Sequence, residues 1–147
     1  MAMQRRILLA EDDPHDVELI RQGLRVAGIA ATDVDVAPDG QAALDKLLAC
    51  VAALDSLPVL VVLDLKMPRM NGLDVLSEMR AVEALAKIPV VMLTSSREAS
   101  DVETAYRLGA NAYVVKPVAF RDFIETVQVV ARFWANLNEP PPPRIPG

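Results

Sequence analysis

Residues 59–64 read Val-Leu-Val-Val-Leu-Asp, an unbroken apolar run followed directly by a carboxylate. A continuous apolar run of this length is typical of a strand in a parallel sheet that helices cover on both faces. A buried strand that ends in a charge places that charge at the edge of the sheet. Asp64 is therefore the first candidate for a functional residue.

Three further apolar runs end in polar residues in the same way. They are residues 7–10 before Glu11 and Asp12, residues 90–93 before Thr94, and residues 113–115 before Lys116. If all these runs are parallel strands, their last residues share one edge of the sheet, where open α/β sheets bind their ligands. That edge would carry several carboxylates, a hydroxyl and an ammonium.

Strand-length apolar runs alternate with amphipathic stretches of helix length, which predicts one α/β domain built on a parallel sheet. The expected strands are residues 6–10, 33–37, 58–64, 88–94 and 112–115, and the expected helices are residues 14–27, 41–54, 72–82, 99–108 and 120–137. Polar and apolar residues alternate in the second expected strand, which predicts that it lies at an edge of the sheet.

The first expected helix has clear boundary signals. Asp13 can cap its start with Pro14 at the first helical position, and Gly28 can adopt the left-handed conformation that ends it. His15, the only histidine, falls in the first turn and is predicted to be a surface residue.

Composition narrows the functional class. With 147 residues and a net charge of −5, the chain fits one domain and lacks the basic cluster typical of nucleic-acid binders. It has no signal segment or membrane-length apolar stretch, and its single cysteine, Cys50, is expected in the core, so we expect a cytoplasmic protein without membrane contact. We expect residues 1–137 to form the domain and the proline-rich residues 138–147 to form an extended tail.

The acidic residues predict a metal site. Glu11, Asp12 and Asp64 would crowd three negative charges together, which is costly without a cation. Mg²⁺ is the natural occupant because it prefers oxygen ligands and leaves positions open for phosphate. Asp64 can then act as a nucleophile on a phosphoryl group whose oxygens are bound by Lys116 and Thr94.

Four segments in the right order resemble the receiver domain of the two-component response-regulator family. They are residues 7–13, 63–72, 92–95 and 113–117. The resemblance implies a flavodoxin-like doubly wound fold with a five-stranded parallel sheet in the order 2-1-3-4-5. It implies that a sensor histidine kinase phosphorylates Asp64, that the protein is not an enzyme beyond slow self-dephosphorylation, and that a cis peptide bond precedes Pro117.

The resemblance also implies roles for individual residues. Glu11 and Asp12 would be the acidic pair that holds Mg²⁺, with the main-chain carbonyl of Lys66 as a further ligand. Thr94 and Tyr113 are similar to the family's switch pair, in which the threonine moves toward the phosphate and the aromatic ring turns inward.

The last expected helix is apolar on two faces. Its core stripe would consist of Phe120, Phe123, Ile124, Val127, Ala131 and Trp134. Val129 and Phe133 fall on a different face, which indicates a second partner.

This long helix, and the long segment of residues 47–57, are similar to the single-domain regulators that accompany bacterial phytochromes. The likeness implies a phytochrome-type sensor kinase as partner and output through protein contacts. It also implies a homodimer formed by the fourth helix, the fifth strand and the fifth helix, with Val129 and Phe133 in the interface.

Simpler explanations and competing functions remain open at this stage. Residues 11–13 could be a solvated loop with a helix cap, and Asp64 could cap a turn. A phosphohydrolase of the haloacid-dehalogenase kind also uses a strand-end aspartate, a lysine and Mg²⁺. That chemistry needs a carboxylate two residues after the nucleophile, where Lys66 stands. A phosphate-independent interaction module is the third possibility.

Overall fold

Five parallel strands form one sheet in the order β2-β1-β3-β4-β5. The structure is a computed structural model and describes residues 5–142. The strands are β1 (Ile7–Ala10), β2 (Val34–Ala37), β3 (Leu60–Leu63), β4 (Val90–Thr94) and β5 (Ala112–Val115). This order confirms the predicted flavodoxin-like fold and places β2 at an edge of the sheet, as its alternating pattern predicted.

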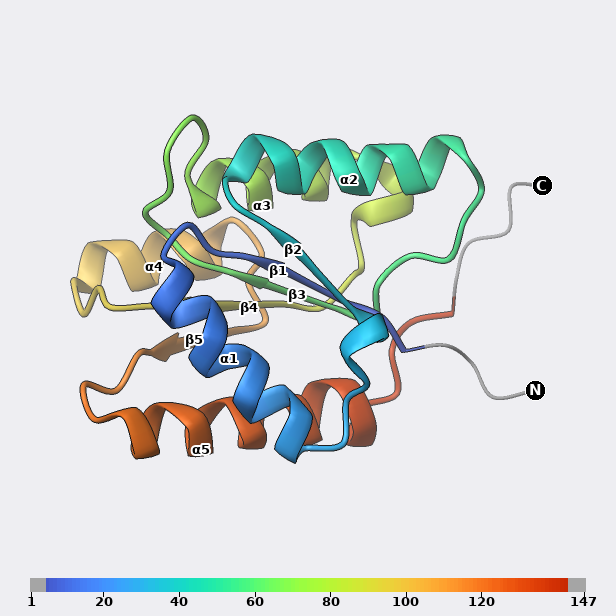
Figure 1. Cartoon of the computed structure of the whole chain (residues 1–147). Helices are drawn as coiled ribbons and strands as arrows, with labels where there is room; N and C mark the ends of the chain where they lie inside the picture. The colour runs from blue at the N-terminus through green and yellow to red at the C-terminus, as the bar shows by residue number, and fades with distance from the viewer. Residues whose placement is uncertain (1–4, 143–147) are drawn as a thin grey trace.

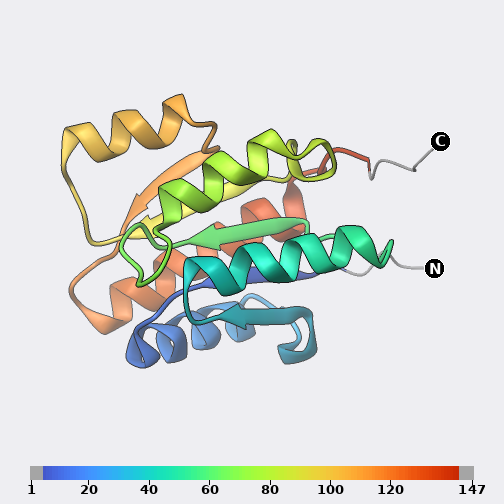
Figure 2. The same cartoon turned by 90° about the horizontal axis from the view of Figure 1, so that it is seen from above.

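Helices cover both faces of the sheet (Figure 1). They are α1 (Pro14–Val26), α2 (Gly40–Ala52), α3 (Gly72–Ala81), α4 (Ala99–Arg107) and α5 (Phe120–Ala131). On one face, α1 and α5 bury a cluster that includes Ile20, Phe123 and Val127. On the other face, α2, α3 and α4 bury a second cluster that includes Leu47 and Leu76, and Figure 2 shows α2 and α3 in front of the sheet.

The start of α1 is fixed by its cap. The Asp13 carboxylate accepts hydrogen bonds from the backbone N–H groups of His15 at 2.8 Å and Asp16 at 3.4 Å, and Pro14 occupies the first turn. The helix ends where Gly28 takes a φ of +89°, as predicted. His15 is exposed, which confirms the prediction for the only histidine.

The last helix has the predicted length but not a uniform geometry, because α5 continues as a π-helical segment at Arg132–Leu137. Phe123, Val127 and Ala131 are buried on its inner side. Val129 and Phe133 are 66% and 49% exposed, so the second apolar face is present.

The prediction that Phe120 belongs to the core stripe was wrong. Its side chain is 61% exposed, and its ring lies 5.0 Å from the ring of His15. The first turns of α1 and α5 lie beyond the carboxyl ends of the strands, where they meet each other. A residue there has no sheet to pack against, so the helical periodicity does not predict its burial.

Two smaller expectations also fail. Among residues 5–142 every peptide bond is trans, including the bond before Pro117, where a cis bond was expected. The two forms of an X-Pro bond differ by only about 0.5–1 kcal/mol, so sequence alone does not fix the isomer. Cys50, expected in the core, is only half-buried and lines a pocket between α2 and β2.

Within residues 5–142, no helix has both the length and the hydrophobicity that crossing a bilayer requires. Of the expected proline-rich tail, residues 143–147 lie outside the described residues.

Arg80, at the end of α3, organises the amino ends of β4 and β5. Its guanidinium donates to the carbonyls of Ala86 at 2.9 Å, Ile88 at 2.8 Å and Gly109 at 2.8 Å, and to the side chain of Asn111 at 3.1 Å. Burial lowers the pKa of this guanidinium. The side chain therefore ties the segments that precede β4 and β5 to α3.

Replacing this guanidinium should destabilise the fold. We expect Arg80→Met to lower the free energy of unfolding by about 2–4 kcal/mol, because several carbonyls lose a charged donor at once. Urea denaturation measures this difference. Arg107→Met, which removes an exposed arginine from α4, serves as the control and should change stability by no more than about 0.5 kcal/mol. Equal losses in the two variants would contradict this account of Arg80.

Candidate functional site

The carboxyl ends of the strands meet at one edge of the sheet. Backbone hydrogen bonds extend the ladder one residue past the strands: the Asp64 N–H donates to the Ala10 carbonyl at 3.0 Å, and the Lys116 N–H donates to the Thr94 carbonyl at 2.8 Å. Glu11, the residue after Ala10, is held beside them. The parallel register therefore brings together the polar residues that the sequence predicted at this edge.

The Lys116 ammonium lies at the centre of this edge. Its Nζ is 2.5 Å from a carboxylate oxygen of Glu11, 2.8 Å from Asp64 and 2.8 Å from Asp16. The lysine side chain is only 9% exposed. An ammonium has three N–H donors, so these three side chains can accept all of its hydrogen bonds.

The acidic residues can hold a hard cation. Glu11, Asp12 and Asp64 each offer an oxygen, and these oxygens lie within 4.8 Å of one another. Glu11 Oε2 is buried and has no hydrogen-bond partner among the described residues. An unpartnered buried carboxylate oxygen is an available ligand, and an all-oxygen set of this kind fits Mg²⁺.

The surroundings shift the pKa values of the two buried carboxyl groups, Glu11 and Asp64, in opposite directions. Burial, together with the neighbouring Asp64, raises the pKa of Glu11 from 4.5 to about 9. Burial would also raise the pKa of Asp64, but its hydrogen bonds with Glu11 and Lys116 hold it below its ordinary value. Burial would lower the pKa of Lys116, but its hydrogen bonds to the carboxylates raise it. Asp64 is therefore an anion near neutral pH, which a nucleophile must be.

Close backbone packing fixes the position of Asp64. A Cβ on Gly72 would lie 2.0 Å from the Asp64 carbonyl oxygen, so only glycine allows α3 to start this close to β3. The Gly72 N–H donates to the Leu65 carbonyl at 2.9 Å, and the Leu65 N–H donates to Asp64 Oδ1 at 2.6 Å. The carboxylate is thus held in one orientation.

The predicted switch residues are connected through Ser96. Thr94 is 1% exposed, and its Oγ1 accepts a hydrogen bond from the Ser96 N–H at 3.4 Å. The Tyr113 hydroxyl donates to the Ser96 carbonyl at 3.0 Å. A change in the Thr94 hydroxyl can therefore reach Tyr113 through one residue.

Lys66 and Asp12 have the most open side chains of the predicted site, since both are exposed. Asp16, the third carboxylate on Lys116, was not among the site residues predicted from the sequence. Its place in the first turn of a helix that begins directly after a strand was the available signal, because side chains there can reach the strand edge.

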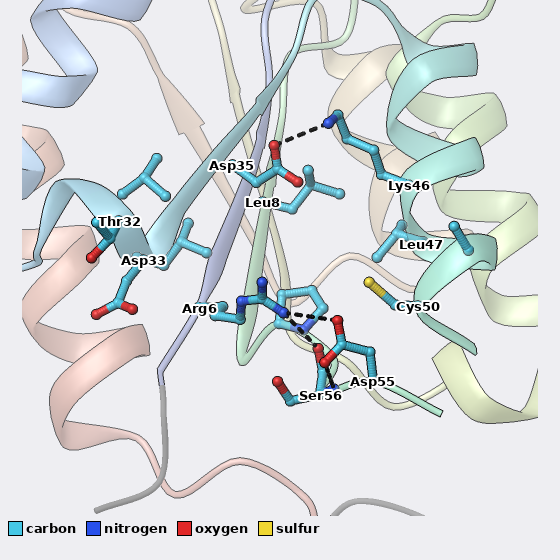
Figure 3. Close-up of a pocket in the computed structure, with 14 residues that line it drawn as sticks. Arg6, Leu8, Thr32, Asp33, Asp35, Lys46, Leu47, Cys50, Asp55 and Ser56 are labelled. Atoms are coloured by element: carbon cyan, nitrogen blue, oxygen red, sulfur yellow. Dashed lines mark hydrogen bonds and ion pairs between the residues drawn. The ribbon is translucent and has the colours of Figure 1, made fainter. Parts of the chain in front are cut away.

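A pocket of 430 Å³ lies elsewhere, between β2 and α2 (Figure 3). Its lining residues lie near the amino ends of the strands, whereas open α/β sheets bind their ligands at the carboxyl ends. Four of its charged residues already form two ion pairs: Lys46 lies 3.1 Å from Asp35, and Arg6 lies 3.4 Å from Asp55. The strand-end cluster is therefore the stronger candidate for the functional site.

The chain is similar to known proteins over most of its length. A model of the response regulator receiver domain matches residues 7–128. The probable methanogenesis regulatory protein FilR2 of Methanothrix harundinacea is 37% identical over 137 residues, which cover 93% of this chain and 88% of FilR2.

Two solved structures are similar over nearly the whole chain. The Mn(2+)-bound form of response regulator Rcp1, a protein of Synechocystis, superposes with a TM-score of 0.83 at 32% identity and covers 94% of this chain and 99% of that one. The bacteriophytochrome response regulator RtBRR is 48% identical, with a TM-score of 0.72 and coverage of 95% and 86%.

The charge balance of the site predicts a coupling between Lys116 and divalent metal. Lys116→Met leaves the buried carboxylates without their cation, and we expect it to lower the unfolding free energy by about 3 kcal/mol in metal-free buffer. Mg²⁺ should raise the melting temperature of this variant more than that of the wild type, because the metal replaces the missing positive charge. Thermal unfolding with and without Mg²⁺ measures both effects.

The control for this experiment is Lys46→Met, which removes a lysine that is 41% exposed and paired with Asp35. It should cost at most about 1 kcal/mol and leave the response to Mg²⁺ as in the wild type. If Lys116→Met and the wild type respond equally to Mg²⁺, the metal and the lysine do not share one site.

Proposed function

This chain belongs to the response regulator receiver family of two-component signalling, and from that premise we propose that Asp64 accepts a phosphoryl group from a sensor histidine kinase. A receiver domain is a signalling domain and not a catalytic enzyme. The observation that carries the proposal is the Asp64 carboxyl group at the end of the central strand β3, 2.8 Å from the Lys116 ammonium.

The proposed transfer is a simple displacement. An Asp64 carboxylate oxygen attacks the phosphorus of a phosphohistidine, and the new O–P bond forms as the P–N bond breaks. The departing imidazole keeps the electron pair and takes up a proton. Lys116 and the hydroxyl of Thr94 would bind the phosphoryl oxygens, whose negative charge is the main obstacle to the reaction.

We propose that Mg²⁺ is the cofactor. Glu11, Asp12 and Asp64 would hold it, together with the main-chain carbonyl of Lys66. When bound, the ion neutralises the carboxylates and the incoming phosphoryl oxygens. The buried, unpartnered oxygen of Glu11 supports this assignment, and so does the similarity to the Mn(2+)-bound form of Rcp1.

The proposed readout uses the contact chain from Thr94 through Ser96 to Tyr113. If the Thr94 hydroxyl moves to donate to a phosphoryl oxygen, the distance between its oxygen and the Ser96 N–H, now 3.4 Å, would change. The Tyr113 hydroxyl rests on the same residue, which supports its role as the second member of the switch pair.

The proposed partners are a phytochrome-type histidine kinase and a second copy of this chain. Similarity to Rcp1, to the phytochrome response regulator RcpA and to RtBRR supports the kinase class. For the homodimer we propose the face formed by α4, β5 and α5. Val129 of α5 and Phe133 of the π-helical segment that continues it are exposed apolar residues, which supports the use of this helix in an interface.

Phosphorylation of Asp64 can be tested directly. With Mg²⁺ and acetyl phosphate, intact-mass spectrometry should show the wild-type protein gaining one phosphoryl group, while Asp64→Asn gains none because its amide is not a nucleophile. Removal of Mg²⁺ with a chelator should abolish the gain.

A matched control is Asp13→Asn. This exposed carboxylate lies two residues from Glu11, and asparagine caps a helix as well as aspartate does, so the variant should keep wild-type phosphorylation. Phosphorylation that persists in Asp64→Asn would exclude Asp64 as the acceptor, and a wild type that gains no phosphate from any donor would favour a phosphate-independent interaction module.

The dimer face is tested by Phe133→Asp. A charge on this half-exposed ring should shift sedimentation from dimer to monomer, because a buried unpaired carboxylate opposes association. Leu54→Asp, at a residue that is 77% exposed beyond the end of α2, is the control and should leave the sedimentation unchanged. A monomeric wild type, with or without phosphate, would contradict the proposed dimer.

A further inference from the structure

The Lys116 ammonium has one partner that the proposed chemistry does not use. Two of its three acceptors, Glu11 and Asp64, belong to the proposed metal site and phosphoacceptor. The third is Asp16, whose Oδ2 lies 2.8 Å from Nζ. Asp16 is not in the group of carboxylates whose oxygens come together within 4.8 Å, so it is not one of the candidate metal ligands.

The three acceptors differ in what happens to them during phosphorylation. A metal draws on the oxygens of Glu11, and the phosphoryl group converts the Asp64 carboxylate into an acyl phosphate. Both changes would alter the acceptors that the lysine now uses, since phosphoryl oxygens would take the place of the Asp64 carboxylate oxygen. Asp16 undergoes neither change, so it is the acceptor that remains constant.

Asp16 is also well fixed by the fold. It lies in the first turn of α1, and its backbone N–H donates to the Asp13 carboxylate that caps the helix. Its side chain is 22% exposed, so solvent only partly competes for it. The cap thus sets the position of the side chain that meets Lys116.

We propose that Asp16 is a positioning residue that holds the Lys116 ammonium beside Asp64 by accepting one of its three hydrogen bonds before and during phosphorylation. The inference rests on the proposed function of Asp64. A long lysine side chain that loses this acceptor gains freedom to rotate, and a small displacement of its charge from the reacting group slows the transfer.

The test compares variants of the full chain at position 16. With acetyl phosphate and saturating Mg²⁺, Asp16→Ala should slow phosphorylation of Asp64 by about tenfold. Asp16→Asn should recover most of the rate, because its amide oxygen still accepts a hydrogen bond. Glu18→Ala, which removes an exposed carboxylate from the same helix, should keep the wild-type rate.

A second measurement reports on the lysine itself, without phosphate. In ¹⁵N NMR of metal-free protein, the Lys116 ammonium should give a protected signal that is absent in Lys116→Met. Asp16→Ala should broaden or remove this signal, and Asp16→Asn should retain it. A merely structural role for Asp16 would not separate these two variants.

The outcomes are distinct. An unchanged rate or an unchanged lysine signal in Asp16→Ala would overturn the proposal, as would Asp16→Asn behaving like Asp16→Ala. If the wild type takes up no phosphate, the proposed function fails, and the lysine signal alone then decides whether Asp16 positions Lys116.

Discussion

The contact of one buried ammonium with several carboxylates is the interaction on which this site depends. A parallel sheet brings the ends of its strands to one edge, so residues far apart in sequence, such as Glu11, Asp64 and Lys116, meet there whatever their charges. Without Lys116 the buried Asp64 carboxylate would have no positively charged partner to offset the cost of burial. The lysine makes the cluster compatible with folding, while the unpartnered oxygen of Glu11 leaves the charge balance open to a metal ion.

The two ends of the sheet each bind a partly buried cationic side chain, but with different kinds of partner. At the amino ends of β4 and β5, the Arg80 guanidinium binds backbone carbonyls, which are neutral and fixed. At the carboxyl ends, Lys116 binds carboxylates that can lose a charge, gain a proton or bind a metal. The first arrangement can only stabilise the structure, whereas the second changes whenever its partners change. The difference favours the carboxyl edge as the place for the proposed phosphoryl chemistry.

The sequence predicted most of the fold because apolar runs of strand length report burial directly. It also predicted the edge residues Glu11, Asp64, Thr94 and Lys116, since a polar residue directly after a buried parallel strand lies at the carboxyl edge of the sheet. It failed where position depends on contacts between elements. Phe120 continues the apolar stripe of α5 but lies beyond the sheet, against His15. Asp16 and Arg80 look like ordinary helix-surface charges until the tertiary structure shows what they bind.

On the proposed function, an acyl phosphate on Asp64 adds negative charge to an edge already rich in carboxylates. Such a charge is stabilised only by groups that can approach it: a metal ion, the Lys116 ammonium and the Thr94 hydroxyl. Lys116 is held by Asp16 and is already beside Asp64, so it need move little. Thr94 accepts a hydrogen bond from the Ser96 N–H at 3.4 Å and keeps its O–H free to donate, so a shift of the hydroxyl toward the phosphate would lengthen or break this contact. On this proposal the change would reach Ser96, whose carbonyl also accepts the hydrogen bond of Tyr113, so the proposed path of the signal runs through the β4–α4 loop.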